Sequence, residues 1–478
     1  MMKSLNRKNI HVKTVYPDKI IQFGTGNFLR AHFDWMVDVM NEKTGYNSGI
    51  QLIKLVPGGS LQSFNEQEGL YHVLLRGISN GTSIDETRMI TCVKGGINPH
   101  EEFDRYLDLA RTPELKIVVS NSTEAGITFS REDFLKNDHP AHTFPGKLTQ
   151  FLKARFDYFK GAPDKGLCYI PCELIENNGR ELKKAILQYA DFWDYPADFS
   201  RWIEDHHYFA NTLVDRIVPG FPKEEADNLY KNIGYEDRYL VSAEPFHLLV
   251  IDGPEEIRKN FPADTAGLNV KFTNDITPYR TSKVRILNGA HTSMVAVGLL
   301  AGLETVRETI EDDTIGSFIE KAIADEISPT INLDVAEVSS FAKEVLDRFR
   351  NPYIHHELKA ISLNSIAKFK VRVLPTILDI FKDTGTPPKR LLFVFACLIK
   401  LYTDPPPWVT LRDEQETLAF FDGLKSQSAN KIVSSVLGNR QLWGVDLTSH
   451  SILLSSVEKY YQSLGGSVTI QEQVRILG

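Results

Sequence analysis

The sequence predicts an α/β protein, in which a doubly wound parallel sheet domain over residues 1–255 is followed by a mostly α-helical domain over residues 256–478. Three observations lead to this prediction. Apolar runs typical of strands alternate with helical periods in the first half, which is the pattern of a parallel sheet. Helical patterns dominate after residue 255. A chain of 478 residues is also too long for a single core by default.

The composition excludes several classes of protein. The chain has 54 Lys and Arg against 62 Asp and Glu, for a formal net charge of −8, and both signs are spread along it. This mixture argues against nucleic acid or an anionic membrane surface as the main partner. Hydrophobic residues make up 42% of the chain, as in an ordinary folded protein. A small anionic substrate stays compatible, because one or two placed cations can hold a carboxylate.

The cysteines and the N-terminal segment favour a cytoplasmic protein without a metal. No C-x-x-C pair occurs, and the cysteines are too few to staple a chain of this length, so buried thiols are expected. The four are Cys92, Cys168, Cys172 and Cys397. No apolar segment follows the basic first residues, and the longest apolar run, 391–401, is too short to cross a bilayer.

The first strong local signal is a strand–helix–strand unit. The run 19–24 is typical of a strand and ends at a glycine. Phe28, Trp35 and Val39 then recur at helical spacing, which predicts a helix through Asn41. The next run, 50–56, is predicted as the second strand.

Further elements continue the alternation and then give way to helices. Strands are predicted at 71–76, 89–93, 115–120 and 167–171, and helices at 101–109, 147–159 and 180–193. In the second half, helical periods cover 283–303, 315–327, 339–349, 374–383 and 391–402, and no convincing strand run occurs after residue 255.

The turn between the first strand and its helix could hold a phosphate. Gly24 would permit a tight turn, and Gly26 would let a pyrophosphate approach the positive end of the helix. The match to G-x-G-x-x-G is partial, because Leu29 replaces the third glycine and no acidic residue follows Val56 to bind a ribose. A structural turn in an unrelated α/β sheet explains the glycines equally well.

A second constellation lies on the predicted helix at 283–303. Lys283, Asn288 and His291 fall within an arc of about 140° on a helix, so an amine, a carboxamide and an imidazole can face one point. These groups suit ketone and alcohol chemistry without a metal, with lysine as the acid or base. An exposed lysine, a helix-contact asparagine and a half-buried histidine are the commoner explanation of such a spacing.

Together, these two segments resemble the polyol-specific long-chain dehydrogenases, the mannitol dehydrogenase family. The likeness extends to the segments 172–179, 214–219 and 244–246 and spans nearly the whole chain. It implies a Rossmann-type N-terminal domain, a mostly helical C-terminal domain, and a zinc-independent, NAD-linked oxidoreductase.

Shorter blocks resemble one branch of that family. The segments 67–71, 120–127, 144–150 and 368–375 are most similar to members that interconvert D-tagaturonate and D-altronate, a hexuronate and an aldonate. The resemblance implies that activity here, within hexuronate catabolism. Reduction of fructuronate, oxidation of mannitol or another polyol, and a dinucleotide-sensing protein without chemistry are the alternatives.

The resemblance also implies roles for particular residues. Lys283 would be the catalytic acid/base, Asn178 and Asn288 would hold the alkoxide-like oxygen, and His291 would bind a substrate hydroxyl. Asn178 is chosen because it directly precedes Gly179, and its neighbour Asn177 stays possible.

A charged substrate needs a local cation. Lys368 and Arg372 are the candidates for the substrate carboxylate, although basic residues four apart also suit a solvated helix face. Asp215 is expected to organise the substrate site, and a carboxylate at the end of a strand or loop, paired with Arg216, is the alternative explanation.

The cofactor is expected to be NAD, on the strength of the family alone. Its binding residues are predicted at the glycine turn and after a later strand, where Glu124 could instead cap a helix or form a salt bridge. They are Phe23, Gly24, Thr25, Gly26, Asn27, Phe28, Thr123 and Glu124.

Overall fold

The structure is a computed structural model that describes residues 3–12, 14–123, 125–135 and 138–477. The chain divides into two compact units. The first comprises Met1–Arg76 and Ile84–Ile276, and the second comprises Gly77–Ser83 and Thr277–Gly478. The predicted boundary lies after residue 255, whereas residues 256–276 belong to the first unit in the structure. The predicted Glu124 lies outside the described residues.

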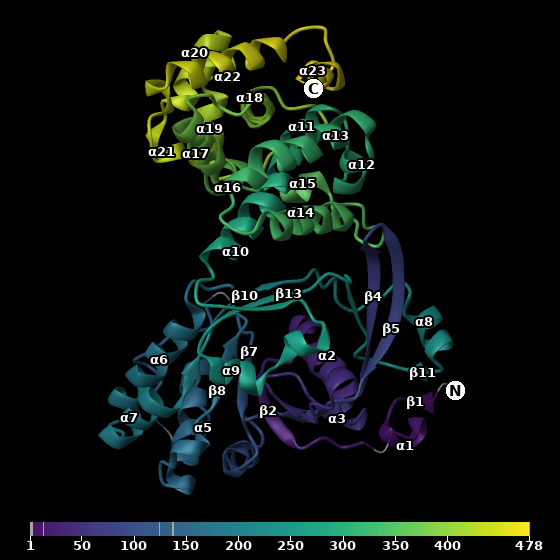
Figure 1. Ribbon diagram of the computed structural model, residues 1–478, viewed down its shortest axis with the longest axis vertical. Helices are drawn as coiled ribbons and strands as arrows, with labels where there is room; N and C mark the ends of the chain where they lie inside the picture. Colours follow the sequence, from purple (N-terminus) through teal and green to yellow (C-terminus); the bar gives the residue numbers. More distant parts are fainter. Residues whose placement is uncertain (1–2, 13, 124, 136–137, 478) are drawn as a thin grey trace. The chain divides into compact units, whose positions relative to one another are not determined.

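The first unit is built on a six-stranded parallel sheet with strand order β6-β3-β2-β7-β8-β9 (Figure 1). The strands are β2 (Asp18–Phe23), β3 (Gly49–Ile53), β6 (Val93–Ile97), β7 (Ile117–Ser120), β8 (Cys168–Pro171) and β9 (Tyr208–Phe209). From β2 the chain adds β3 and β6 on one side and then returns to add β7, β8 and β9 on the other, so the strand order reverses between β2 and β7. The predicted fold class is confirmed, and ligands of such sheets bind at that reversal.

Helices cover both faces of this sheet because its strands alternate their side chains. Ile20 packs in one apolar cluster with α2, whereas Ile21 and Phe23 pack in another with α5 and α6. The helices of this unit are α1 (Arg7–Ile10), α2 (Asn27–Thr44), α3 (Gln62–Glu66), α4 (Phe103–Asp108), α5 (Phe144–Phe159), α6 (Asn178–Phe192), α7 (Ala197–His206), α8 (Ala226–Ile233) and α9 (Glu255–Asn260).

Three smaller sheets contain the strand predicted at 71–76 and several strands that were not predicted. Their orders are β12-β4-β5, β10-β13-β14 and β1-β11. The strands are β1 (Lys3–Ser4), β4 (Tyr71–Ser79), β5 (Thr82–Ile90), β10 (Asn211–Asp215), β11 (Tyr235–Glu236), β12 (Val241–Ala243), β13 (Leu248–Asp252) and β14 (Val270–Thr273). The single strand predicted at 89–93 is wrong, because the chain leaves one sheet at Ile90 and enters another at Val93. β14, in parallel pairing with β13, lies where no strand was expected.

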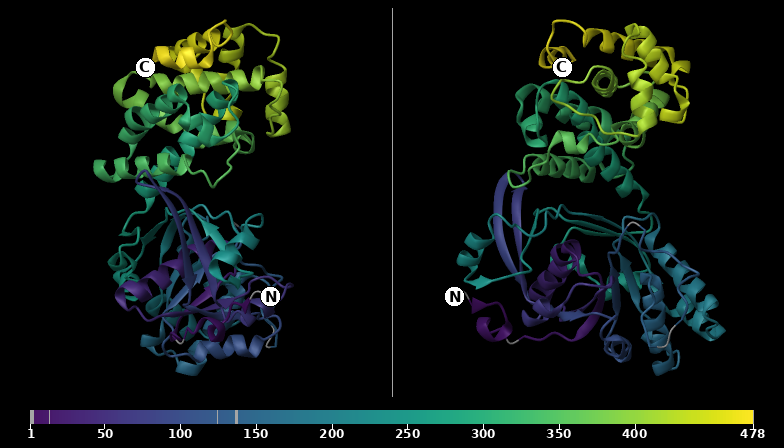
Figure 2. Two further views of the ribbon diagram at one scale, coloured as in Figure 1. Left: turned by 90° about the vertical axis from the view of Figure 1, so that its right-hand side faces the viewer. Right: turned by 180° about the vertical axis from the view of Figure 1, so that it is seen from behind.

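The second unit is helical apart from its segment 77–83 (Figure 2). One apolar cluster forms its core, around the buried helices α11 and α18. Its α-helices are α10 (Thr277–Ser282), α11 (Gly289–Leu300), α12 (Val306–Glu311), α13 (Asp313–Lys321), α14 (Val335–Phe349), α15 (Leu358–Ile361), α16 (Ser365–Arg372), α17 (Leu374–Thr384), α18 (Lys389–Thr403), α19 (Gln415–Asp422), α20 (Ala429–Leu437), α21 (Arg440–Trp443), α22 (Ser451–Ser463) and α23 (Ile470–Leu477). Within the described ranges, no helix has both the length and the apolar character that crossing a membrane requires.

Candidate functional site

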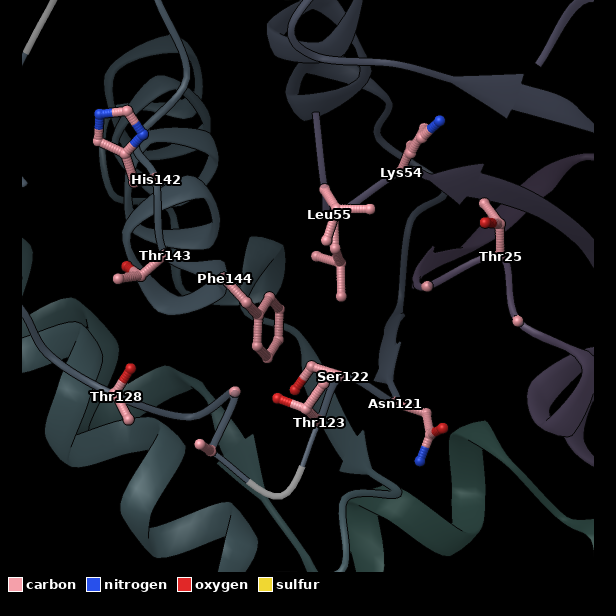
Figure 3. A pocket seen from close by; sticks show the side chains of 15 residues that line it. Thr25, Lys54, Leu55, Asn121, Ser122, Thr123, Thr128, His142, Thr143 and Phe144 are labelled. Atoms are coloured by element: carbon pink, nitrogen blue, oxygen red, sulfur yellow. The ribbon is translucent and has the colours of Figure 1, made fainter. Parts of the chain in front are cut away.

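A pocket of about 430 Å³ opens at the edge of the parallel sheet where the strand order reverses, between β2 and β7 (Figure 3). It is formed by the turn after β2, the end of β3, the loop after β7 and the start of α5. The described residues that line it are Gly24, Thr25, Gly26, Lys54, Leu55, Val56, Asn121, Ser122, Thr123, Ala125, Gly126, Thr128, His142, Thr143 and Phe144. Three of the six residues predicted at the glycine turn are among them, together with Thr123.

The two glycines of the turn have different tasks. Gly24 has φ +122°, donates its N–H to the Ile53 carbonyl at 2.9 Å, and would place an added Cβ 2.9 Å from the Asn121 carbonyl oxygen. Gly26 caps α2 without a side-chain hydrogen bond, and an added Cβ there would meet nothing within 4 Å. The open space at this helix start fits the pyrophosphate of a dinucleotide.

The other three predicted turn residues do not line the pocket. Phe23 is buried, with its ring 5.2 Å from that of Phe144. Asn27 accepts a hydrogen bond from Arg30, and the ring of Phe28 stacks on His32 at 4.9 Å. These three side chains support the turn and the first part of α2.

A buried carboxylate that the sequence analysis missed fastens the loop after β7. Glu173 accepts hydrogen bonds from the Ser120 hydroxyl at 3.0 Å and from the N–H and hydroxyl of Ser122 at 2.9 Å each. Burial raises the pKa of Glu173 above its usual value. Asn121, next to these serines, donates to the Cys172 carbonyl at 2.7 Å. The loops after β7 and β8 are therefore tied together.

Two basic residues of the pocket were also missed. The predicted strand ran to Val56, but β3 ends at Ile53, so Lys54 is the residue at its carboxyl end. The Lys54 ammonium donates to the carbonyls of Gly58 and Gly59. His142 enters the pocket from the segment before α5, and no local pattern in the sequence marks it.

Asn178 is buried at the start of α6, and its side-chain amide is hydrogen-bonded both to its own loop and to β10. Its amide group donates to the carbonyls of Pro171 and Glu173, each at 3.0 Å, and its oxygen accepts from the N–H groups of Gly179 and Thr212 at 2.9 Å. Asn177 precedes it with φ +54° and is only half-buried. Of the two, Asn177 is the more accessible carboxamide.

Asp215 is buried at the end of β10, opposite Leu248. The next residue, Arg216, donates to the carbonyls of Glu244 at 2.9 Å and Ala31 at 2.7 Å, and its guanidinium lies 4.4 Å from the Trp35 ring centre. Burial lowers the pKa of Arg216 to about 9. Arg216 is therefore a buried structural cation.

In the second unit, the predicted Lys283 and Asn288 are the first and last residues of a π-helical turn. On an α-helix, two residues five apart are separated by about 140°. A π-helix bonds residue i to i+5 and brings them to the same side. Both side chains are half-buried. Such turns are frequent at functional sites, and the sequence analysis did not predict this one.

His291, in the first turn of α11, lies beside two other aromatic rings. Its ring lies 4.4 Å from that of Phe349 and 5.0 Å from that of His356, centre to centre. Burial lowers the pKa of His356, which favours a neutral ring beside His291.

Arg372 contacts α11, whereas Lys368 bonds to a backbone carbonyl before α16. Arg372 donates to the Thr292 hydroxyl at 3.5 Å, and that hydroxyl donates to the Asn288 carbonyl at 2.9 Å. Burial lowers the pKa of Arg372. The Lys368 ammonium instead donates to the Ile361 carbonyl at 2.8 Å. Of the two predicted cations, the structure brings Arg372 to the helix of Asn288.

Two family models match the chain over most of its length. Residues 18–264 match the mannitol dehydrogenase Rossmann domain, and residues 275–465 match the mannitol dehydrogenase C-terminal domain. Among curated proteins, the altronate oxidoreductase of Bacillus subtilis (strain 168) is 43% identical over 96% of this chain and 95% of its own. That of Yersinia enterocolitica is 42% identical over 97% of both chains.

Solved structures agree with this fold. A D-sorbitol dehydrogenase in substrate-free form has a TM-score of 0.81 at 22% identity, covering 99% of this chain and 100% of that one. Pseudomonas fluorescens mannitol 2-dehydrogenase, solved with NAD and D-mannitol, has a TM-score of 0.63 at 22% identity and 99% coverage of both. With both domains matched in order, this chain belongs to the mannitol dehydrogenase family of oxidoreductases.

Proposed function

We propose that this protein is an NAD-linked oxidoreductase that interconverts D-tagaturonate and D-altronate without a metal ion. The relatives named altronate oxidoreductase, at 42–43% identity over nearly the full length, support the choice of substrate. The chemistry is supported by the π-helical turn, because such a turn places its first and last residues, Lys283 and Asn288, on the same side of the helix.

The pocket at the sheet reversal is proposed to hold the dinucleotide. Its fit rests on the open start of α2 at Gly26, whose N–H groups suit a pyrophosphate, and on the apolar walls of Leu55 and Phe144. When bound, NADH supplies the hydride that reduces the substrate ketone. Thr123 belongs to the loop assigned to the nicotinamide end.

Lys283 is proposed to carry the proton. In reduction, its ammonium donates a proton to the ketone oxygen, and in the reverse direction its neutral amine takes the proton of the alcohol. Asn288 donates an amide N–H to that oxygen while negative charge develops on it. His291, held between Phe349 and His356, is proposed to bind a neighbouring hydroxyl of the substrate.

The remaining assignments concern the carboxylate and the loop after β8. Arg372 is proposed to bind the substrate carboxylate as a bidentate partner, with Lys368 adding positive charge nearby. Either Asn177 or Asn178 is proposed to supply a second carboxamide to the reacting oxygen. Replacing each residue singly distinguishes which one does so. Asp215 is proposed to organise the substrate site.

A substrate panel tests the proposal. NADH oxidation is followed with D-tagaturonate, D-fructuronate and D-fructose under identical conditions, with and without EDTA. We expect a clear preference for D-tagaturonate that EDTA does not change. A preference for fructose would contradict the acidic substrate, and a preference for fructuronate would keep the family and change the substrate.

A further inference from the structure

A second imidazole lies beside the histidine that is proposed to bind a substrate hydroxyl. The ring of His356 stands nearly at right angles to that of His291, with their centres 5.0 Å apart and 79° between their planes. Phe349 contacts His291 as well, with its ring tilted by 38° and its centre at 4.4 Å. Phe349 is buried in the apolar core of the second unit, whereas His356 is half-buried. Of these two rings, only that of His356 carries polar atoms.

The position of His356 is fixed by its backbone. Its carbonyl accepts the N–H of Val306 at 2.9 Å, and two residues later the N–H of Leu358 donates to the Glu304 carbonyl at 2.8 Å. The residues between these two hydrogen bonds pair as an antiparallel bridge. Leu358 then begins α15, which packs on α11, the helix of His291 (Figure 1). The chain itself therefore holds the two imidazoles together.

The ring nitrogens of His356 are available to a ligand. Within the described part of the chain, neither nitrogen has a hydrogen-bond partner, and neither is among the buried polar atoms, so solvent reaches them. Burial of the ring lowers the pKa of His356, which favours the neutral form near pH 7. A neutral imidazole offers one donor and one acceptor, and this combination suits a hydroxyl group better than a carboxylate.

The proposed substrate supplies a group for this ring. His291 is proposed to bind a hydroxyl that neighbours the ketone, and the following carbon of a ketouronate carries another hydroxyl. Adjacent hydroxyls are close enough for two imidazoles in contact to hold one each. D-Tagaturonate and D-fructuronate differ only in the configuration of the second carbon from the ketone. A residue that binds the hydroxyl on that carbon therefore distinguishes the two compounds.

We propose that His356 is a specificity-determining residue, which hydrogen-bonds the hydroxyl on the second carbon from the ketone and so makes the protein prefer D-tagaturonate to D-fructuronate. The inference rests on the proposed function, since it concerns the substrate of that reaction. His291 and His356 then bind neighbouring hydroxyls of the same chain. With D-fructuronate, the corresponding hydroxyl points elsewhere and the imidazole loses its partner, which lowers kcat/KM.

The variant His356→Phe tests the polar role alone, because it keeps an aromatic ring against His291 and removes both nitrogens. NADH oxidation is measured with D-tagaturonate and with D-fructuronate, and the two values of kcat/KM are compared as a ratio. We expect the ratio to fall by about tenfold, the effect of losing one hydrogen bond to a hydroxyl. The loss should fall on D-tagaturonate, and the dissociation constant for NADH should stay unchanged.

Further variants complete the test. His355→Phe replaces the adjacent histidine, whose side chain is 76% exposed, and should leave the ratio unchanged. His356→Gln keeps a donor and an acceptor without the ring and should retain part of the preference. Thermal unfolding shows whether each variant is folded. If phenylalanine unfolds the chain, His356→Ala gives the same comparison with a smaller side chain.

The parent and the variants test different statements. A parent that reduces neither ketouronate, or that prefers D-fructuronate, overturns the proposed substrate and this inference with it. When the parent prefers D-tagaturonate, the folded His356→Phe or His356→Ala variant decides the role of His356. An unchanged ratio, or equal losses for both substrates, overturns that role and leaves the proposed function standing.

Discussion

Asn288 ends the π-helical turn that Lys283 begins, five residues earlier in the chain. A regular α-helix would hold these two side chains about 140° apart. The wider turn brings these two positions toward the same side of the helix, which the proposed proton transfer requires. The relationship is local to the second unit and follows from backbone geometry alone.

Replacing Lys283 tests the proton transfer. Lys283→Met should lower kcat by about 10²- to 10⁴-fold, the usual contribution of a positioned acid or base. The dissociation constant for NADH should change far less, because the pocket at the glycine turn belongs to the first unit. Steady-state kinetics and a fluorescence titration measure the two effects. The exposed lysine variant Lys382→Ala is the control, and near-normal turnover of Lys283→Met would contradict the assignment.

Replacing Arg372 tests the carboxylate contact. Arg372→Ala should lower kcat/KM for D-tagaturonate by about tenfold or more, since a charge-assisted contact contributes about 1.5–3 kcal/mol. The same change should affect D-fructose much less, because fructose has no carboxylate. Arg372→Lys should recover part of the loss. Equal losses for both substrates would show that Arg372 only supports the helix through Thr292.

Substitutions at Asn177 and Asn178 distinguish a structural role from a role in the reaction. Asn178→Ala should destabilise the fold by about 1–3 kcal/mol, because it leaves the N–H of Thr212 and two carbonyls without their partner. Asn177→Ala should leave the denaturation midpoint nearly unchanged. Urea unfolding of both variants, followed by kcat, shows which carboxamide the reaction uses. A stable Asn178→Ala variant would contradict the hydrogen-bond argument.

Replacing Gly24 should impair folding, whereas replacing Gly26 should impair dinucleotide binding. Gly24→Ala should lower the melting temperature, because φ is +122° and the new methyl would lie 2.9 Å from a carbonyl oxygen. Gly26→Ala should fold like the parent, because its methyl meets no protein atom within 4 Å, and should weaken dinucleotide binding by occupying the open space. Thermal unfolding and an NADH titration together distinguish them. The reverse pattern would refute the division of tasks.

We expect His247 to make the free energy of unfolding fall in acid. Its Nε2 accepts the N–H of Asn269 at 3.0 Å, and burial, followed by the charge of Arg216, lowers its pKa from 6.5 to about 3. Between about pH 6.5 and pH 3, His247 is therefore protonated in the unfolded chain and neutral in the folded chain. Stability from this residue is complete above pH 6.5 and falls toward pH 3 by about 1.4 kcal/mol per pH unit. His247→Gln should show a shallower decline in urea midpoints than the parent, whereas the exposed His355→Gln should not.

The sequence predicted the strand–turn–helix unit well because its signals are local. The apolar run of β2 stops at a glycine, and the following helix repeats its apolar residues at one spacing. The end of β3 was misplaced, because Leu55 and Val56 continue an apolar run that pairing alone interrupts. Ile53 is the last residue opposite a partner, Ile97 of β6. Lys54 was overlooked for that reason.

Other parts of the site depend on tertiary structure. His142 enters the pocket from a segment far along the chain from Lys54, and nothing in its neighbours marks it. The π-helical turn is only six residues long and lies between α-helical segments, so hydrophobic periodicity over a longer window could not reveal it. The family is confirmed by the matched models, whereas the roles given to individual side chains stay predictions.

Glu173 couples the loop after β7 to the loop after β8. Its carboxylate holds both Ser120 and Ser122, at the loop assigned to the nicotinamide end, while its own backbone carbonyl receives the side chain of Asn178. A displacement of either loop would pull on the other through one buried side chain. If the dinucleotide binds beside Thr123 as proposed, any shift of the loop after β7 would be transmitted through Glu173 to the segment that carries Asn177.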